Sequence, residues 1–368
     1  MIKAMHQPLA LSFLLDEAIG LSGADAFLAA LGARLVADGV PLAGGALTQA
    51  VPHPIIARRT FLWRAETAAV VEALGLGVAL PADSGQGNVG REWLTGLGAG
   101  VVREDVVGAA TVGGVSDAAV LGWATTRALS APEAKLLGDV ARFAAAPLAV
   151  LASRATLSAL LETYLGRRSA AQVLAGRLRR ESSETIRAVL LYADLRGFTE
   201  LSEADAPKVV VAALDAWFDR IAGAVHAFGG EVLKFIGDGV LAIFPIGERN
   251  AAAACDAALR AVAGARAGMN HLDRQRVSEG LSPLPFGMAL HVGDMLWGNI
   301  GTADRLDFTA IGRAVNLVSR LEGLCRSLGY PVLLSGAFAA ETKLPLVALG
   351  EHALRGITAP CAVFTLHE

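Results

Sequence analysis

The sequence predicts an α+β protein of two domains, and three observations support this prediction. The chain has 368 residues, which exceeds the roughly 150 residues of a typical domain. Its N-terminal part mixes helical and strand-like segments, whereas its C-terminal half runs strand, helix, hairpin, helix, strand. The second order is typical of the split βαβ arrangement of ferredoxin-like folds.

Residues 1–129 are expected to form an N-terminal α+β regulatory domain. Two amphipathic helices are predicted within residues 12–40. Strands rich in β-branched and aromatic residues are predicted at 44–51, 58–65, 105–114 and 117–128. The order of these elements resembles that of GAF-type sensor domains, but no motif identifies a ligand. We therefore expect this domain to sense an unknown small-molecule or protein signal.

Residues 130–184 are predicted to connect the two domains. Ser130 and Glu133 have the Ser-x-x-Glu spacing of a capping box, which opens a helix that contains Pro147 and runs to Leu165. Leucines at 157, 160, 161 and 165 form one stripe along this helix. The stripe would either pair with its copy in a dimer or pack on its own domain. The polar and basic segment 166–187 is predicted to be a linker.

Residues 185–368 are expected to form the second domain, whose elements follow the split βαβ order. We predict a buried strand at 188–195, a helix at 207–228, a hairpin at 232–244, a helix at 249–270, a strand at 285–293 and a helix at 313–329. In the hairpin, Gly237-Asp238-Gly239 suits a tight two-residue turn. This half of the chain carries the residues with recognisable chemistry.

Composition and charge argue against several classes of protein. The longest apolar run, Phe143–Ser153, is far shorter than the roughly 20 residues that cross a bilayer, so no membrane span is predicted. The N-terminus lacks the cleavage site of a secretory signal. A net charge of −3 disfavours a nucleic-acid-binding protein. Cys255, Cys325 and Cys361 form neither a zinc pattern nor a disulfide framework, which predicts a cytoplasmic protein.

Two aspartates lie where neighbouring strands are predicted to end. Asp194 ends the first strand of the second domain, and Asp238 is at the tip of the hairpin. The first strand is central in a split βαβ sheet, so the two carboxylates can converge. Paired acids of this kind hold Mg²⁺ and leave positions open for phosphate oxygens. The alternative is that Asp238 only caps its own turn.

Asn316 and Arg320 lie four residues apart, so they share one face of the last predicted helix. An asparagine can orient a sugar oxygen, and an arginine offers a fork of donors to phosphate charge. Alone, this helix would pass for an ordinary surface helix with polar residues.

Four segments resemble the successive motifs of the class III nucleotidyl cyclases, the adenylate and guanylate cyclase family. They are "YADLRGFTELS", "GGEVLKFIGDGVLAIF", "ALHVGDMLWGNIG" and "DFTAIGRAVNLVSRLE". The resemblance spans residues 185–368. It implies that the protein converts a nucleoside triphosphate to the 3′,5′-cyclic monophosphate and pyrophosphate. It also implies that each active site uses two Mg²⁺ or Mn²⁺ ions.

The resemblance further implies a role for each of six side chains. These roles are metal binding by Asp194 and Asp238, purine recognition by Lys234 and Thr309, ribose orientation by Asn316, and stabilisation of charge on the α-phosphate by Arg320. The family forms its sites at a head-to-tail homodimer interface, so the two acids of one subunit would face the other four residues of its partner.

The purine-recognition pair favours ATP as the substrate. Lys234 can only donate, which suits adenine N1, and Thr309 can accept from the adenine amino group. This pair resembles that of a bacterial subgroup of adenylate cyclases. Arg313 stands where many relatives have aspartate, and no physical reason for that change is evident. Two alternatives stay open, namely a guanylate cyclase and a non-catalytic dimeric ligand sensor.

Overall fold

The computed structural model describes residues 7–51, 56–76, 88–98, 100–108, 118–177, 179, 183–247, 250–302 and 304–367. The chain forms two compact units, Met1–Tyr164 and Leu165–Glu368, which are described separately below. The finer division into a sensor, a connecting segment and a catalytic domain at residues 129 and 184 stays a prediction.

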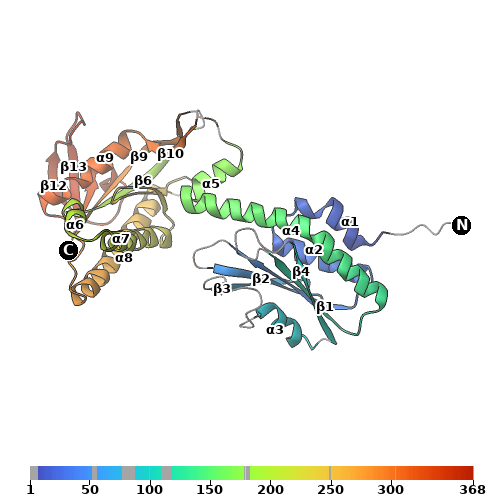
Figure 1. Ribbon diagram of the computed structural model, residues 1–368. Helices are drawn as coiled ribbons and strands as arrows, with labels where there is room; N and C mark the ends of the chain where they lie inside the picture. The colour runs from blue at the N-terminus through green and yellow to red at the C-terminus, as the bar shows by residue number, and fades with distance from the viewer. Residues whose placement is uncertain are drawn as a thin grey trace. The chain divides into compact units, whose positions relative to one another are not determined.

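The N-terminal unit contains a five-stranded antiparallel sheet with helices on both faces (Figure 1). In the order β3-β2-β1-β5-β4, the strands are Val70–Leu76, Ile56–Arg64, Leu42–Ala50, Ala119–Thr125 and Val101–Val107. The helices are α1 (Leu9–Asp16), the 3₁₀ turn η1 (Ala18–Gly20), α2 (Ala24–Ala37), α3 (Val89–Gly96) and α4 (Ala131–Leu165). The mixed α+β class predicted for this unit is confirmed.

The core of this unit lies between the sheet and the helices α1, α2 and α4. Trp63 and Trp123 are both buried there and pack edge to face, with ring centroids 6.4 Å apart. On the opposite face, α3 covers the sheet through Leu94. Strand β3 and helix α3 were not predicted. The predicted strand 105–114 overlaps β4 only at its start, and residues 109–114 lie outside the described part of the chain.

Helix α4 opens with the predicted capping interaction, because Glu133 accepts a hydrogen bond from the backbone N–H of Ser130 at 2.7 Å. Its N-terminal half buries Leu137, Val140 and Leu148 in the unit's core. Within the described ranges, α4 alone has the length and apolar composition of a membrane span, and 22% of its most apolar stretch is buried. The expected absence of a membrane span therefore stays a prediction.

The C-terminal unit is built on an eight-stranded sheet. In the order β12-β13-β11-β9-β6-β8-β7, the strands are Leu346–His352, Cys361–Leu366, Val332–Ser335, Phe286–Gly301, Ser183–Leu195, Gly239–Pro245 and Glu231–Ile236; β10 (Leu306–Ile311) pairs with β9. Strand β6 lies between β9 and β8 and is antiparallel to both. The run β9-β6-β8-β7 is the predicted split βαβ arrangement.

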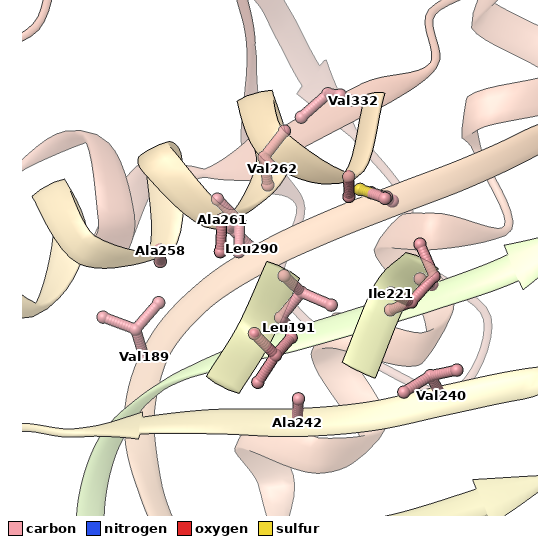
Figure 2. Packing of buried hydrophobic residues seen from close by; sticks show 14 of the residues in the cluster. Val189, Leu191, Ile221, Val240, Ala242, Ala258, Ala261, Val262, Leu290 and Val332 are labelled. Carbon is pink, nitrogen blue, oxygen red and sulfur yellow. The ribbon is translucent and has the colours of Figure 1, made fainter. Parts of the chain in front are cut away.

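Helices cover both faces of this sheet. They are α5 (Arg167–Leu174), α6 (Phe198–Ala204), α7 (Pro207–Ala227), α8 (Ala251–Ser278), α9 (Arg313–Glu322), α10 (Cys325–Leu328) and α11 (Gly336–Ala339). Figure 2 shows the larger core, in which Leu191 of β6 and Val240 of β8 meet Ile221 of α7 and Val262 of α8. A second core on the other face joins β6 and β9 to α9 and β10. Strand β6 is thus buried on both faces.

The segment 166–187, predicted to be a linker, is not one over its whole length. Residues 167–174 form α5, and β6 already begins at Ser183. Arg168 of α5 fixes this helix to the sheet, since its guanidinium bonds Glu231 of β7 at 2.8 Å and Glu184 of β6 at 3.0 Å. These long-range ion pairs explain how the polar and basic helix α5 is held on the sheet.

Candidate active site

The carboxyl groups of Asp194 and Asp238 lie side by side, close enough to act on each other's ionisation. Asp194 is near the end of β6, and Asp238 is in the two-residue turn between β7 and β8, the two strands that follow α7. Burial, and next the charge of Asp238, raise the pKa of Asp194 to about 7. The predicted convergence of these two acids is therefore observed, because β6 and β8 are neighbours in the sheet.

The backbone of the hairpin tip is held by α7. Gly237 has a φ of 62°, a left-handed conformation that glycine adopts without strain. The buried Trp217 of α7 donates a hydrogen bond from Nε1 to the carbonyl oxygen of Asp238 at 2.8 Å. This bond anchors the turn to α7, so that the Asp238 side chain meets Asp194. Sequence reasoning missed Trp217, since it lies 21 residues before its partner.

Two further polar side chains, Tyr192 and Glu322, lie near the acid pair. Tyr192 lies two residues before Asp194 on the same face of β6, close to Ser319 of α9. Burial, and next the charge of Asp194, raise the pKa of Tyr192 to about 12. Glu322, at the end of α9, is buried as well, and burial raises its pKa to about 7. The acid pair thus lies in a partly desolvated pocket of negative charge.

A β-bulge places Lys234 on the face of the sheet that carries α9 and β10, opposite α7 and α8. Val232 pairs with Ala242, but Lys234 pairs with Leu241, so Leu233 is an extra residue in β7. Leu233 packs in the core that contains β10, and Lys234 forms an ion pair with Asp307 of β10. The bulge thus turns two consecutive side chains to one face.

Thr309 lies on the same face of β10 as Asp307, two residues away. The intervening Phe308 faces the other way and stacks on Trp297, with ring centroids 6.0 Å apart. The structure therefore gathers Lys234, Asp307 and Thr309 at one exposed edge of the unit. Asp307 was not predicted to belong to the site.

Asn316 and Arg320 share the exposed face of α9, as their spacing predicts. The opposite face of this helix packs into the second core through Ala314, Val318 and Leu321. Within the described part of the chain, no hydrogen bond or ion pair joins the acid pair to Lys234, Asn316 or Arg320. Within one subunit, the candidate residues thus form three separate groups. These are the acid pair, Lys234 with Thr309, and Asn316 with Arg320.

The acid pair has the chemistry of a divalent-cation site. Two carboxyl groups in contact repel each other when both are ionised, and a cation between them relieves that repulsion. No cluster of three or more His, Cys, Asp or Glu side chains arranged for a metal occurs in the described ranges. The protein would therefore supply two carboxylates, which is the usual protein share where substrate phosphates complete the coordination of Mg²⁺.

The part of the chain that contains the acid pair matches a known family of catalytic domains. Residues 181–337 match the model of the adenylate and guanylate cyclase catalytic domain. The chain thus carries a catalytic domain of the class III adenylate and guanylate cyclase family, as the four motifs predicted.

Relatives with this domain include adenylate cyclases of bacteria. Adenylate cyclase 1 of Rhizobium meliloti is 36% identical over 156 residues, which cover 42% of this chain and 23% of the relative. An adenylate cyclase of Anabaena cylindrica is 30% identical over 168 residues, which cover 45% of this chain and 32% of the relative. The chain thus spans about a quarter to a third of the length of these relatives.

One solved structure resembles this chain beyond the cyclase domain. The structure of a bacterial light-regulated adenylyl cyclase aligns over 88% of this chain and 93% of its own, with a TM-score of 0.52. The sequence identity is 17%, so this likeness concerns the fold alone.

Proposed function

We propose that the protein is an adenylate cyclase that converts ATP to 3′,5′-cyclic AMP and pyrophosphate. The contact between Asp194 and Asp238 is the observation that carries this proposal, because it places two carboxylates where a triphosphate with its cations would bind. Two Mg²⁺ or Mn²⁺ ions held by these residues would lower the pKa of the ribose 3′-hydroxyl and neutralise phosphate charge.

The remaining residues would position the substrate. Asn316 would orient the ribose, so that its 3′-oxygen lies in line with the bond between the α-phosphorus and the leaving pyrophosphate. Arg320 would donate to the α-phosphate oxygens as their charge grows. The 3′-oxygen bonds to phosphorus, the bond to the pyrophosphate oxygen breaks, and the hydroxyl proton leaves to solvent.

Adenine is the base that the exposed edge of β10 suits best. Lys234 donates only, which matches adenine N1, and Thr309 can accept from the amino group. Asp307 holds the Lys234 ammonium at this edge. A guanylate cyclase is the alternative, and a guanine-recognising site would be expected to carry an acid at the position of Lys234, because guanine N1 and N2 are donors.

A second copy of the chain would complete each site. Ile311 lies on the same face of β10 as Thr309, and it pairs with Leu296 of β9, whose side chain lies on that face as well. Leu296 is 48% exposed and Ile311 is 45% exposed. Exposed apolar side chains gathered around polar site residues mark an interaction surface. We therefore place Asp194 and Asp238 of one copy opposite the other four residues of its partner.

We also propose that the N-terminal unit regulates this reaction. A cavity of about 730 Å³ lies within that unit, which is a size typical of small-molecule sites. Its lining includes the apolar side chains of Phe61 and Leu151, and Arg59, Glu72 and Arg154 supply charge of both signs. Because Leu151 and Arg154 belong to α4, a ligand in this cavity would contact the helix that precedes the cyclase unit in the chain.

Three free thiols support our proposal of a cytoplasmic location. Cys255, Cys325 and Cys361 form no disulfide bond in the described chain. A reducing compartment keeps cysteines in this state.

The function is tested by incubating the full chain with ATP or GTP and Mn²⁺, and measuring cyclic nucleotide and pyrophosphate. We expect cyclic AMP and pyrophosphate in equal amounts, with ATP used at least about tenfold better than GTP. Asp238→Ala should abolish turnover. Formation of cyclic GMP alone, or no cyclic nucleotide from a folded protein, would refute the proposal.

A further inference from the structure

Glu322 is a buried acid that none of the roles proposed above uses. It ends α9 and is only 9% exposed. Within the described chain, no hydrogen bond or ion pair reaches its carboxyl group. Burial removes most of the water around a carboxyl group and so disfavours its ionised form, and an acid that is kept at such a place calls for a reason.

The Glu322 carboxyl group lies beside Asp194. Gly287 of β9 is the direct register partner of Asp194 of β6. A side chain at Gly287 would collide with Oε1 of Glu322, which shows that this oxygen fills the space above the glycine. The charge of Glu322 also acts on Asp194, while that of Asp238 acts on Glu322. Glu322 is therefore a third acid at the same strand end.

Arg196 supplies the positive charge behind this cluster. It follows Asp194 by two residues, and its Nη2 donates to the carbonyl oxygen of Tyr330 at 2.9 Å. Its Nε is buried and has no hydrogen-bond partner. The charge of Arg196 favours the ionised form of Glu322, which burial opposes. A cation, Arg196, and one acid of the pair, Asp238, thus both act on Glu322.

We infer that Glu322 is a positioning residue of the cation site, where its charge acts through Asp194 and Asp238. The inference rests on the proposed function, since it concerns the metal that those aspartates would hold. Glu322 would not be a ligand, because the described residues form no three-acid ligand set. It would strengthen cation binding as a nearby negative charge, and it would tie the end of α9 to the strand that carries Asp194.

The test measures Mn²⁺ binding to the full chain by the paramagnetic resonance signal of free Mn²⁺, with no nucleotide present. Glu322→Gln keeps the shape and removes the charge, and we expect it to weaken Mn²⁺ binding about tenfold. Glu322→Asp shortens the side chain and keeps the charge, so it should bind Mn²⁺ more tightly than Glu322→Gln. A merely structural role would give the reverse order, because glutamine fills the space better.

Glu203→Gln is the matched control, since Glu203 is exposed on α6 and the substitution changes the net charge equally. It should bind Mn²⁺ like the wild type. If Glu322→Gln also binds like the wild type, the inference is overturned while the metal site stands. If the wild type binds no Mn²⁺, the proposed metal site fails and the inference fails with it. Circular dichroism of each variant confirms that the chain is folded.

Discussion

The indole of Trp217 and the backbone of Asp238 are joined by a hydrogen bond of 2.8 Å between two elements that lie far apart in the sequence. Trp217 is fully buried in the core beneath the sheet, whereas Asp238 is in the hairpin turn. The hydrophobic core thus sets the position of the turn that carries a candidate metal ligand. Loosening this bond should affect cation binding as well as stability.

Trp217→Phe should lower the free energy of unfolding by about 1–3 kcal/mol, because the carbonyl of Asp238 loses its partner and the core loses part of a ring. It should also weaken Mn²⁺ binding several-fold. Trp297→Phe is the control, since the buried Trp297 N–H has no hydrogen-bond partner to lose. Denaturant unfolding and Mn²⁺ titration check both variants. Equal Mn²⁺ affinity in the two variants would contradict a positioning role for Trp217.

The stabilisation of the protein by Mn²⁺ should increase with pH. Between about pH 4 and pH 7, the native chain holds protons on Asp194 and Glu322 that the unfolded chain has released. The free energy of unfolding of the metal-free protein therefore falls in that window as the pH rises. A bound cation favours the ionised carboxylates and offsets this loss.

Thermal unfolding with and without Mn²⁺ measures this effect. We expect a small shift in Tm at about pH 5.5 and a clearly larger one at about pH 8. Asp194→Asn lacks one of the titrating groups, so its shift in Tm on addition of Mn²⁺ should depend less on pH. A shift in Tm that is equal at both pH values would show that these acids do not bind the ion.

Asp307→Asn should affect the recognition of the adenine base more than the stability of the fold. The pair with Lys234 is partly exposed, so its loss should change the free energy of unfolding by less than about 1 kcal/mol. The freed Lys234 ammonium would be less well positioned toward adenine N1, which should raise the KM for ATP. Steady-state kinetics with ATP and with 1-deaza-ATP, which lacks the N1 acceptor, measure this contribution.

Lys234→Met is the companion variant. If Asp307 acts through Lys234, adding Asp307→Asn to Lys234→Met should change the KM no further. Additive effects of the two substitutions would show that Asp307 contributes independently of the lysine.

Ala155→Trp should fill the cavity of the N-terminal unit from α4. The amphipathic anion 1-anilinonaphthalene-8-sulfonate is a suitable probe, since the cavity offers apolar surface together with Arg59 and Arg154. We expect its fluorescence enhancement to be lost in Ala155→Trp. It should persist in Leu157→Trp, which alters an exposed residue of the same helix outside the cavity. Fluorescence that is lost in Leu157→Trp but kept in Ala155→Trp would show that the probe binds outside the cavity.

Much of the candidate site could be predicted from the sequence, because it follows from the order of the elements. A strand, a helix and a hairpin in split βαβ order place the first strand beside the hairpin, so Asp194 and Asp238 meet. Asn316 and Arg320 share a face because their spacing matches the helical repeat. These inferences need only local patterns and one topology.

The rest depends on contacts between distant residues, which no local pattern reveals. The partnership of Lys234 with Asp307 requires the bulge at Leu233, and Oε1 of Glu322 occupies the space that a side chain at residue 287 would take. Likewise, the helix α5 is held by ion pairs of Arg168 to two strands. The strands β11, β12 and β13 extend the sheet in a region where no element was predicted.

The central claim is that the two acids of one copy and the remaining residues of another form one site. Mixing Asp194→Ala and Arg320→Ala subunits, each inactive alone, tests it most directly. In a mixed dimer one site carries both substitutions and the other carries neither. We therefore predict about one quarter of the wild-type cyclic AMP production after equal mixing. No recovery in dimers shown to contain both variants would contradict a shared site.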